Sequence, residues 1–164
     1  MPEHNTRAGD IGIEEIPREE LPEFWELHLR YLTEDGIITD PEDIEYFAGE
    51  EYRGILTSRV GRAEDPHRMV YFLRDGRRIG AASYGLFHDE GDKCFLMDFW
   101  VFPPFRGNGT GHRCFEALEA RARAQGARCF ELNSAKPDSA RFWKSLGFVE
   151  TGVDEDGLPL LFRE

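Results

Sequence analysis

"FWVFPPFRGNGTGHRCFEAL", residues 99–118, passes from an aromatic run through two prolines into three alternating glycines and then into a helical pattern. Gly107, Gly109 and Gly111 stand where that helix has to begin. A glycine inside a helix costs about 1 kcal/mol relative to alanine, so three of them need a compensating reason. The free amides and partial positive charge of a helix N-terminus suit a phosphate group. The stretch therefore predicts a strand, a phosphate-binding turn and a helix.

The periodicity on both sides of this stretch predicts a mixed sheet. Asp75 and Gly76 join two apolar runs as a hairpin, and Gly126 marks the end of the helix that follows the glycines. The predicted strands are 11–16, the two arms of 69–87, 93–102, 128–132, 148–153 and 158–163, and the predicted helices are 18–32, 41–56, 109–125 and 139–146. This order, β-α-α-β-β-β-α-β-α-β-β, predicts an α/β fold of the α+β type. We expect a mainly antiparallel sheet with helices on both faces, in which strands 93–102 and 128–132 pair in parallel.

Length and composition limit the function. The 164 residues are 40% hydrophobic and 32% charged, which predicts one globular domain over 11–164 after a flexible tail over 1–10. The net charge of −12 argues against nucleic-acid binding, since phosphate contacts need clustered Lys and Arg. No apolar run approaches the roughly 20 residues of a membrane span, so we expect a cytoplasmic protein. The cysteine and histidine spacings match no metal-site motif, so no metal is expected.

The spacing of the glycines distinguishes between phosphate turns. A P-loop requires Gly-Lys-Ser/Thr, but His112 follows Gly111, and a dinucleotide fold requires G-x-G-x-x-G after an early strand. The segment VFPPFRGNGTG, residues 101–111, instead resembles the V-x-P-x-x-R-G-x-G-x-G motif of the GCN5-related N-acetyltransferase (GNAT) family. SARFWKSLGF, residues 139–148, resembles its later A-x-x-F-Y-x-x-x-G-F segment. The element order over 11–162 is similar to that family too.

The resemblance implies an acetyl-coenzyme A site. Turn amides of the family bind the pyrophosphate, and the backbone of the preceding strand pairs with the pantetheine arm and polarises the thioester carbonyl. Carried onto this sequence, the cofactor-binding residues are Phe99, Trp100, Val101, Arg106, Gly107, Asn108, Gly109, Thr110, Gly111, His112 and Phe142. For Phe142 and the neighbouring Trp143, packing in the core is the alternative.

The resemblance also exposes three departures. Asp98 is the single acid on the strand that often carries the family's base, and it faces away from the site unless a bulge intervenes, so a structural carboxylate is the alternative role. Trp143 replaces the usual tyrosine acid, which leaves the general acid unknown. Either another group protonates the sulfur, for which Tyr84 and Cys129 are unsupported substitutes, or the sulfur leaves as a thiolate. Lys136 stands where many members have asparagine.

Function follows from the resemblance as an expectation. We expect an acetyl-coenzyme A-dependent N-acetyltransferase in which a primary amine of a small molecule, a lysine or an N-terminus attacks directly in a ternary complex. The acidic residues of 31–47 either bind a cationic acceptor or are only solvent-exposed charges favoured by the helix dipole at the start of a helix. The alternatives are a coenzyme A-binding module without turnover and a transferase with another acyl group or acceptor. A homodimer is expected by analogy.

Overall fold

The computed structural model describes residues 10–134 and 136–164. Nearly all of the tail expected over 1–10 lies outside the described residues. The strands are β1 (Gly12–Glu15), β2 (His67–Arg74), β3 (Arg77–Phe87), β4 (Lys93–Val101), β5 (Cys129–Asn133), β6 (Val149–Val153) and β7 (Pro159–Arg163). The α-helices are α1 (Leu21–Glu34), α2 (Pro41–Ala48), α3 (Glu50–Arg59), α4 (Thr110–Ala124) and α5 (Pro137–Ser145).

All seven strands form one sheet in the order β1-β2-β3-β4-β5-β7-β6. The β4–β5 pair is parallel and the other pairs are antiparallel. Asp75 and Gly76 both have positive φ, 50° and 76°, as the tight hairpin between β2 and β3 requires. The predicted fold class is confirmed.

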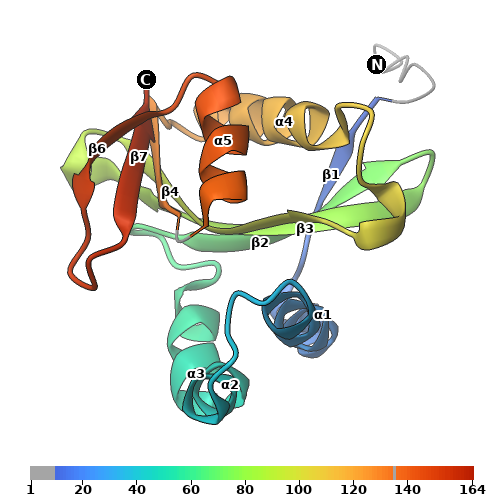
Figure 1. Cartoon of the computed structure of the whole chain (residues 1–164). Helices are drawn as coiled ribbons and strands as arrows, with labels where there is room; N and C mark the ends of the chain where they lie inside the picture. The colour runs from blue at the N-terminus through green and yellow to red at the C-terminus, as the bar shows by residue number, and fades with distance from the viewer. Residues whose placement is uncertain (1–9, 135) are drawn as a thin grey trace.

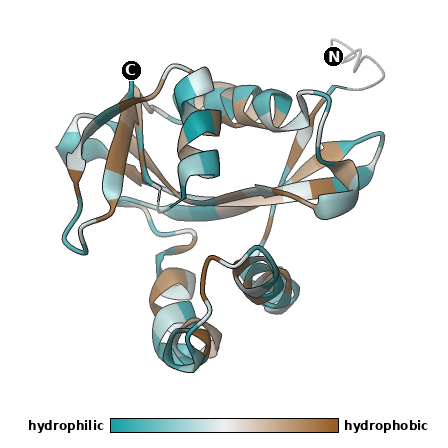
Figure 2. Cartoon of the chain, in the orientation of Figure 1, coloured by the Kyte–Doolittle hydropathy of each residue, from teal (hydrophilic) through white to brown (hydrophobic). Residues whose placement is uncertain are grey.

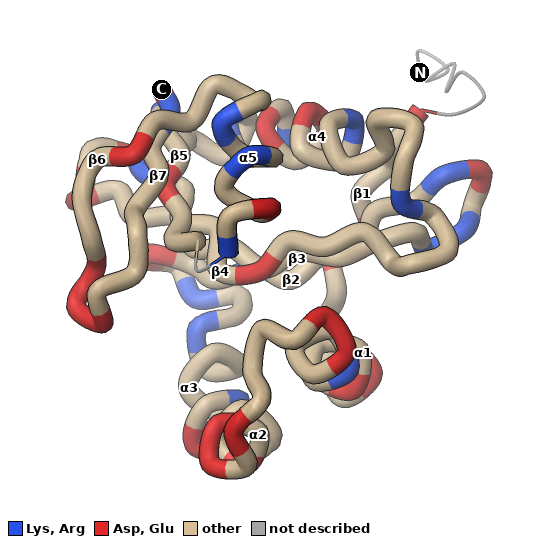
Figure 3. Tube along the Cα trace, viewed as in Figure 1, with Lys and Arg blue, Asp and Glu red and all other residues tan. Residues whose placement is uncertain are grey.

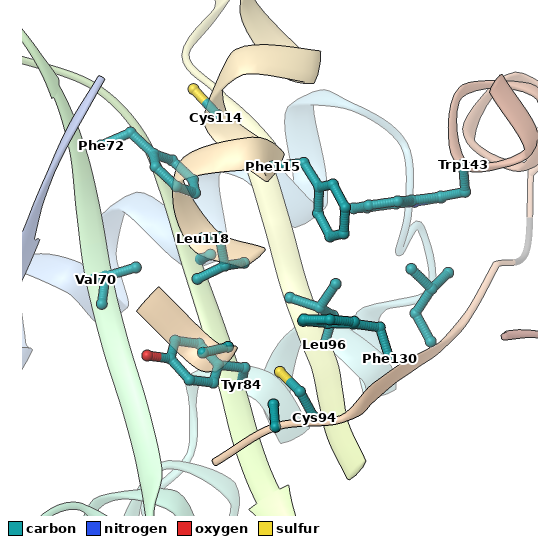
Figure 4. Close-up of a cluster of buried hydrophobic side chains, with 14 of the residues drawn as sticks. Val70, Phe72, Tyr84, Cys94, Leu96, Cys114, Phe115, Leu118, Phe130 and Trp143 are labelled. Carbon is teal, nitrogen blue, oxygen red and sulfur yellow. The ribbon is translucent and has the colours of Figure 1, made fainter. Parts of the chain in front are cut away.

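Helices cover both faces of the sheet (Figure 1), with α4 and α5 on one side and α1, α2 and α3 on the other. One apolar cluster fills the space beneath α4 and α5, where Phe115, Leu118 and Trp143 meet side chains of the strands (Figure 4). A second cluster, which includes Phe24 and Trp100, packs α1 against the opposite face. Figure 2 shows hydrophilic colour on the outward turns of α4 and α5 and brown on β7. None of the described helices is both long and apolar enough to cross a membrane.

The single helix expected over 41–56 is two helices. The chain leaves the helical conformation at Gly49, with φ −86° and ψ 160°, and α3 starts again at the next residue. The break restarts the helical phase, so Leu56 is buried while its neighbour Ile55 is exposed. Asp40 caps α2, since its carboxylate accepts from the Glu42 amide at 3.0 Å.

β4 has two irregularities, a β-bulge and a short pairing with β5. Ser83 pairs with Asp98 but Tyr84 pairs with Leu96, so Met97 is the extra residue of a β-bulge. β4 and β5 then pair only over Lys93–Phe95 and Cys129–Glu131, although β4 continues to Val101. The second half of β4 therefore separates from β5 and leaves an open strand edge.

Candidate active site

A cleft of about 490 Å³ lies where β4 separates from β5, between the glycine turn and α5. We call it the turn cleft. Its lining residues are Tyr31, Asp35, Phe99, Trp100, Val101, Arg106, Gly107, Gly109, Thr110, Gly111, His112, Ser139, Phe142 and Trp143. Of the residues predicted to bind coenzyme, Asn108 alone is absent from this lining, so the structure brings the others together around one cavity.

The glycine turn offers free backbone donors at the start of α4. Gly107 and Gly109 have φ of 97° and 75°, and Asn108 between them has 56°. The Thr110 hydroxyl donates to the Gly107 carbonyl at 2.8 Å, which closes the turn. Within the described residues, no carbonyl accepts from the amides of Gly111 and His112. These two donors line the cleft at the positive end of the helix dipole.

The three glycines each have a reason within the protein itself. Gly107 and Gly109 occupy left-handed backbone, and a Cβ at either position would meet open space. Gly111 has ordinary helical backbone, but its Cβ would lie 2.8 Å from Cε2 of Phe142. Two of the glycines therefore meet the backbone requirement of the turn, and the third meets a packing requirement of α5.

Aromatic rings form the wall of the cleft opposite the turn. Trp143 is 5% exposed, and its ring lies 5.0 Å from Phe99 and 5.5 Å from Phe115. Phe142 stacks on Phe99 at 6.0 Å and meets the His112 ring at 5.4 Å. Trp143 is thus mainly a core residue, whereas Phe142 is partly exposed beside the helix start.

An ion pair crosses the mouth of the cleft. The Arg106 guanidinium donates to both carboxylate oxygens of Asp35, at 2.8 and 3.3 Å, and also to the Val101 carbonyl at 2.7 Å. Lys136, which stands at the family's asparagine position, donates to the Asp35 carbonyl at 2.5 Å. Asp35, just after α1, therefore connects the glycine turn to the segment before α5.

A second cavity of about 800 Å³, the Asp98 cavity, lies beside the turn cleft and shares Tyr31, Asp35, Arg106 and Ser139 with it. Asp98 lines this cavity, with its side chain 10% exposed. The bulge at Met97 directs Asp98 toward α1, which answers the question that strand alternation left open. Of the six acids in residues 31–47, only Asp35 lines this cavity.

Asp98 is held by groups from two elements. The Ser83 hydroxyl of β3 donates to Oδ2 at 3.0 Å. Nε2 of the fully buried His28 on α1 lies 3.1 Å from Oδ1, an ion-pair distance without the angle of a hydrogen bond. Burial acts to raise the pKa of Asp98, but His28 and Ser83 outweigh it and hold the pKa below its ordinary value. Asp98 is therefore a carboxylate at neutral pH.

His28 and Tyr31 are not among the site residues predicted from the sequence. His28 lies between the stacked rings of Phe24 and Tyr52, at 5.9 and 6.1 Å, on the buried stripe of α1. A polar residue in phase with that stripe is the signal that could have revealed it. Tyr31 stacks on Trp100 at 4.6 Å and lines both cavities.

The substitutes considered for the missing acid lie elsewhere. The Tyr84 hydroxyl donates to the Gln125 side chain at 2.8 Å, and the Cys129 thiol lies near the Gly91 carbonyl at 3.7 Å. Neither residue lines the turn cleft or the Asp98 cavity. No group of three His, Cys, Asp or Glu side chains suited to a metal ion occurs among the described residues.

Residues 13–148 match the model of the Acetyltransferase (GNAT) family, which spans most of the chain. The chain belongs to the GNAT acetyltransferase family. Among curated GNAT proteins, it is 24% identical over 119 residues to the uncharacterized N-acetyltransferase YycN of Bacillus subtilis strain 168, covering 69% of this chain and 74% of YycN.

Solved GNAT structures share the fold. The crystal structure of YycN matches with a TM-score of 0.72 at 22% identity, covering 88% of this chain and 95% of that one. The PaiA N-acetyltransferase of Thermoplasma acidophilum, solved with coenzyme A, matches with a TM-score of 0.71 at 16% identity, covering 94% and 99%. RimL, a ribosomal L7/L12 α-N-protein acetyltransferase solved with coenzyme A, matches with a TM-score of 0.69 at 15% identity, covering 94% and 93%.

Proposed function

We propose that this protein transfers the acetyl group of acetyl-coenzyme A to a primary amine, by direct attack within a ternary complex. The observation that carries the proposal is the junction of the two cavities. On one side, an open strand edge leads to a helix N-terminus with free amides. On the other side, the Asp98 carboxylate lines a larger cavity that shares residues with the first. We therefore assign acetyl-coenzyme A to the turn cleft and the amine to the Asp98 cavity.

The residues of the turn cleft fit coenzyme A. The amides of Gly111 and His112 would bind the pyrophosphate, and the free edge of β4 near Phe99, Trp100 and Val101 would pair with the amides of the pantetheine arm. That PaiA and RimL were solved with coenzyme A supports this assignment. Bound acetyl-coenzyme A supplies an activated acetyl group as a thioester.

Asp98 is the proposed proton acceptor for the amine. An alkylammonium ion cannot attack an acyl carbon, so the acceptor must lose a proton at the site. The Asp98 carboxylate is charged, largely shielded from solvent and held by Ser83 and His28. It binds the ammonium group electrostatically and accepts its proton, directly or through water.

Tyr31 is the proposed donor to the leaving thiolate, in place of the family's tyrosine. Its ring lines both cavities, whereas Trp143 lies in the core and its indole is too weak an acid. Burial, followed by the charges of Asp98 and Asp35, raises the pKa of Tyr31 above its usual range. The phenol keeps its proton at neutral pH and stabilises the thiolate by a hydrogen bond.

Two measurements test the proposal. Isothermal titration with acetyl-coenzyme A, coenzyme A and ATP should give micromolar binding for the two coenzymes and none for ATP. A free-thiol assay with acetyl-coenzyme A and a panel of primary amines should then show amine-dependent release. Binding of the coenzymes without thiol release in the presence of any amine would support the non-catalytic module. No binding of either coenzyme would refute the assignment of the cleft.

A further inference from the structure

A third cavity of about 270 Å³ continues the Asp98 cavity along β4, and the two share Phe95 and Met97. We call it the Arg59 cavity. Its other lining residues include Arg59, Arg62, His67 and Lys93. The two cavities adjoin at Phe95 and Met97, and together they extend from Asp98 to the connection between α3 and β2; we call this row of two cavities the groove.

The pleat of β4 explains why both cavities lie on the same face of the strand. Cys94 and Leu96 point to the core under α4, so Lys93 and Phe95 face the α1–α3 side. The bulge at Met97 then keeps Asp98 on that same side. A charged end at Asp98 and an apolar middle at Phe95 and Met97 follow one another along a single strand.

The far end of the groove carries unpaired positive charge. Figure 3 shows Lys and Arg colour on the connection between α3 and β2, below the sheet. Within the described part of the chain, neither Arg59 nor Arg62 forms a salt bridge, and the Arg62 guanidinium donates only to the Asp65 carbonyl, at 2.9 Å.

The carboxylates of this cavity are already engaged. Lys93 donates to Glu131 at 3.1 Å and to Glu90 at 3.4 Å, so both carboxylates already contact a cation, although one ammonium offsets only one of their two charges. The Asp65 carboxylate accepts from the His88 amide at 3.2 Å. The two arginines therefore remain as the groups available to an anion.

His67 supplies an independent sign of a ligand. It lines the Arg59 cavity and is 2% exposed, and its Nε2 atom is buried without a hydrogen-bond partner in the described residues. A buried polar atom left unpaired costs about 1–3 kcal/mol, so such atoms usually serve a ligand or a water. A ligand oxygen next to Nε2–H would satisfy it.

We infer that the acceptor is an amine whose far end carries an anionic group, a carboxylate or a phosphate, bound by Arg59, Arg62 and His67. The inference rests on the proposed function, because it places the reacting amine at Asp98. The apolar segment between the two charged ends packs over Phe95 and Met97. The groove thus matches a molecule with opposite charges at its two ends.

The test is a comparison of matched acceptors. Chains of increasing length that end in a carboxylate, such as 5-aminopentanoate, are compared with the corresponding alkylamines, such as pentylamine, and with ω-aminoalkyl phosphates. At one chain length, the anionic acceptor should have a kcat/KM about tenfold or more above that of the alkylamine. The phosphate series shows which anion the site prefers.

Variants locate the effect. Arg59→Gln and Arg62→Gln should each remove most of the preference while leaving kcat/KM for the alkylamine unchanged. Arg128→Gln, which removes an exposed arginine outside the groove, is the matched control and should keep the preference. Equal kcat/KM values for the amines that end in an anionic group and for the corresponding alkylamines, measured with the unmodified protein, would overturn the inference. The proposed function would still stand.

A binding measurement keeps the inference separate from turnover. The imidazole NMR signals of His67 are followed while 5-aminopentanoate is titrated into the protein with coenzyme A present. A saturable shift that Arg59→Gln weakens supports the anion site even if no amine is acetylated, in which case the proposed function alone fails. The absence of any shift at millimolar 5-aminopentanoate overturns the inference, as equal kcat/KM values would.

Discussion

His28 on α1 and Asp98 on β4 are 3.1 Å apart at Nε2 and Oδ1, although 69 residues separate them between positions 28 and 98. The contact joins the helical layer to the sheet at the bottom of the larger cavity. It also determines the charge there, since Asp98 without His28 would be a buried carboxylate with only the Ser83 hydroxyl as a partner.

His28→Gln should change the pH dependence of the reaction. Burial alone would raise the pKa of Asp98, and His28 is the main group that lowers it. The acid limb of the kcat/KM profile should therefore move to higher pH in the variant. Asp98→Asn, as the reference, should lower kcat/KM by about 10²-fold or more near neutral pH. A profile that neither variant alters would exclude Asp98 as the base.

Gly109→Glu should abolish binding of acetyl-coenzyme A while the protein remains folded. The new carboxylate would stand at the start of α4, where an anionic ligand is expected, and would repel it. Gly76→Glu is the matched control, because Gly76 has nearly the same φ, 76° against 75°, in the hairpin between β2 and β3. Isothermal titration that gives equal affinities for both variants would refute a phosphate site at the turn.

Gly111→Ala should destabilise the protein. The added Cβ would lie 2.8 Å from the Phe142 ring, and such overpacking costs about 1–3 kcal/mol. Gly54→Ala in α3 meets nothing within 4 Å and should stabilise the helix by up to about 1 kcal/mol. Urea unfolding measures both. Adding Phe142→Leu to Gly111→Ala should recover part of the lost stability. An unchanged urea midpoint for Gly111→Ala would contradict the packing explanation.

Tyr31→Phe should lower kcat more than it changes KM for the amine. The substitution keeps the ring that stacks on Trp100 and removes only the hydroxyl proposed to stabilise the leaving thiolate. We expect a loss of about 10²-fold, the low end for a lost proton donor. With a thioester whose thiol is more acidic, the loss should shrink; a loss of the same size for both thioesters would mean that Tyr31 acts on the acceptor instead.

Stability should decrease as the pH falls through the window set by His67. Burial lowers the pKa of His67 from 6.5 to about 4, so between these values the unfolded chain binds a proton that the folded chain does not. The free energy of unfolding should fall by roughly 3 kcal/mol across that window and then stop responding to His67. Urea unfolding of His67→Leu should show a smaller decrease over the same range, and an equal decrease would exclude His67 as its source.

The sequence predicted the sheet, the parallel crossover around the glycine turn and most element boundaries, because those features depend on local periodicity. It predicted the phosphate-binding turn for the same reason, because the strand, the turn and α4 are contiguous in the chain. The other residues expected in the turn cleft came from the resemblance to the GNAT family. Residues 93–118 contain nearly all of that information.

What the sequence did not predict depends on contacts between distant segments. The extra residue at Met97 changes the direction of Asp98 without leaving a mark in the residue pattern. The reason for Gly111 lies in Phe142, which belongs to another helix. His28 is marked in the sequence only as a polar residue on the apolar stripe of α1, and its partner Asp98 appears only when α1 packs on β4. Tyr31 has no such mark, because its contact with Trp100 also depends on that packing. The expected homodimer stays a prediction.

The short pairing of β4 with β5 has a consequence for how the molecule opens. Three residue pairs join the strands on either side of the cleft, whereas β3 and β4 pair over most of their length. The unit of β5, α5, β6 and β7 should therefore detach at a lower free energy than global unfolding. Amide hydrogen exchange should show these strands exchanging together, ahead of β2 and β3, and a ligand that bridges the cleft should slow that exchange.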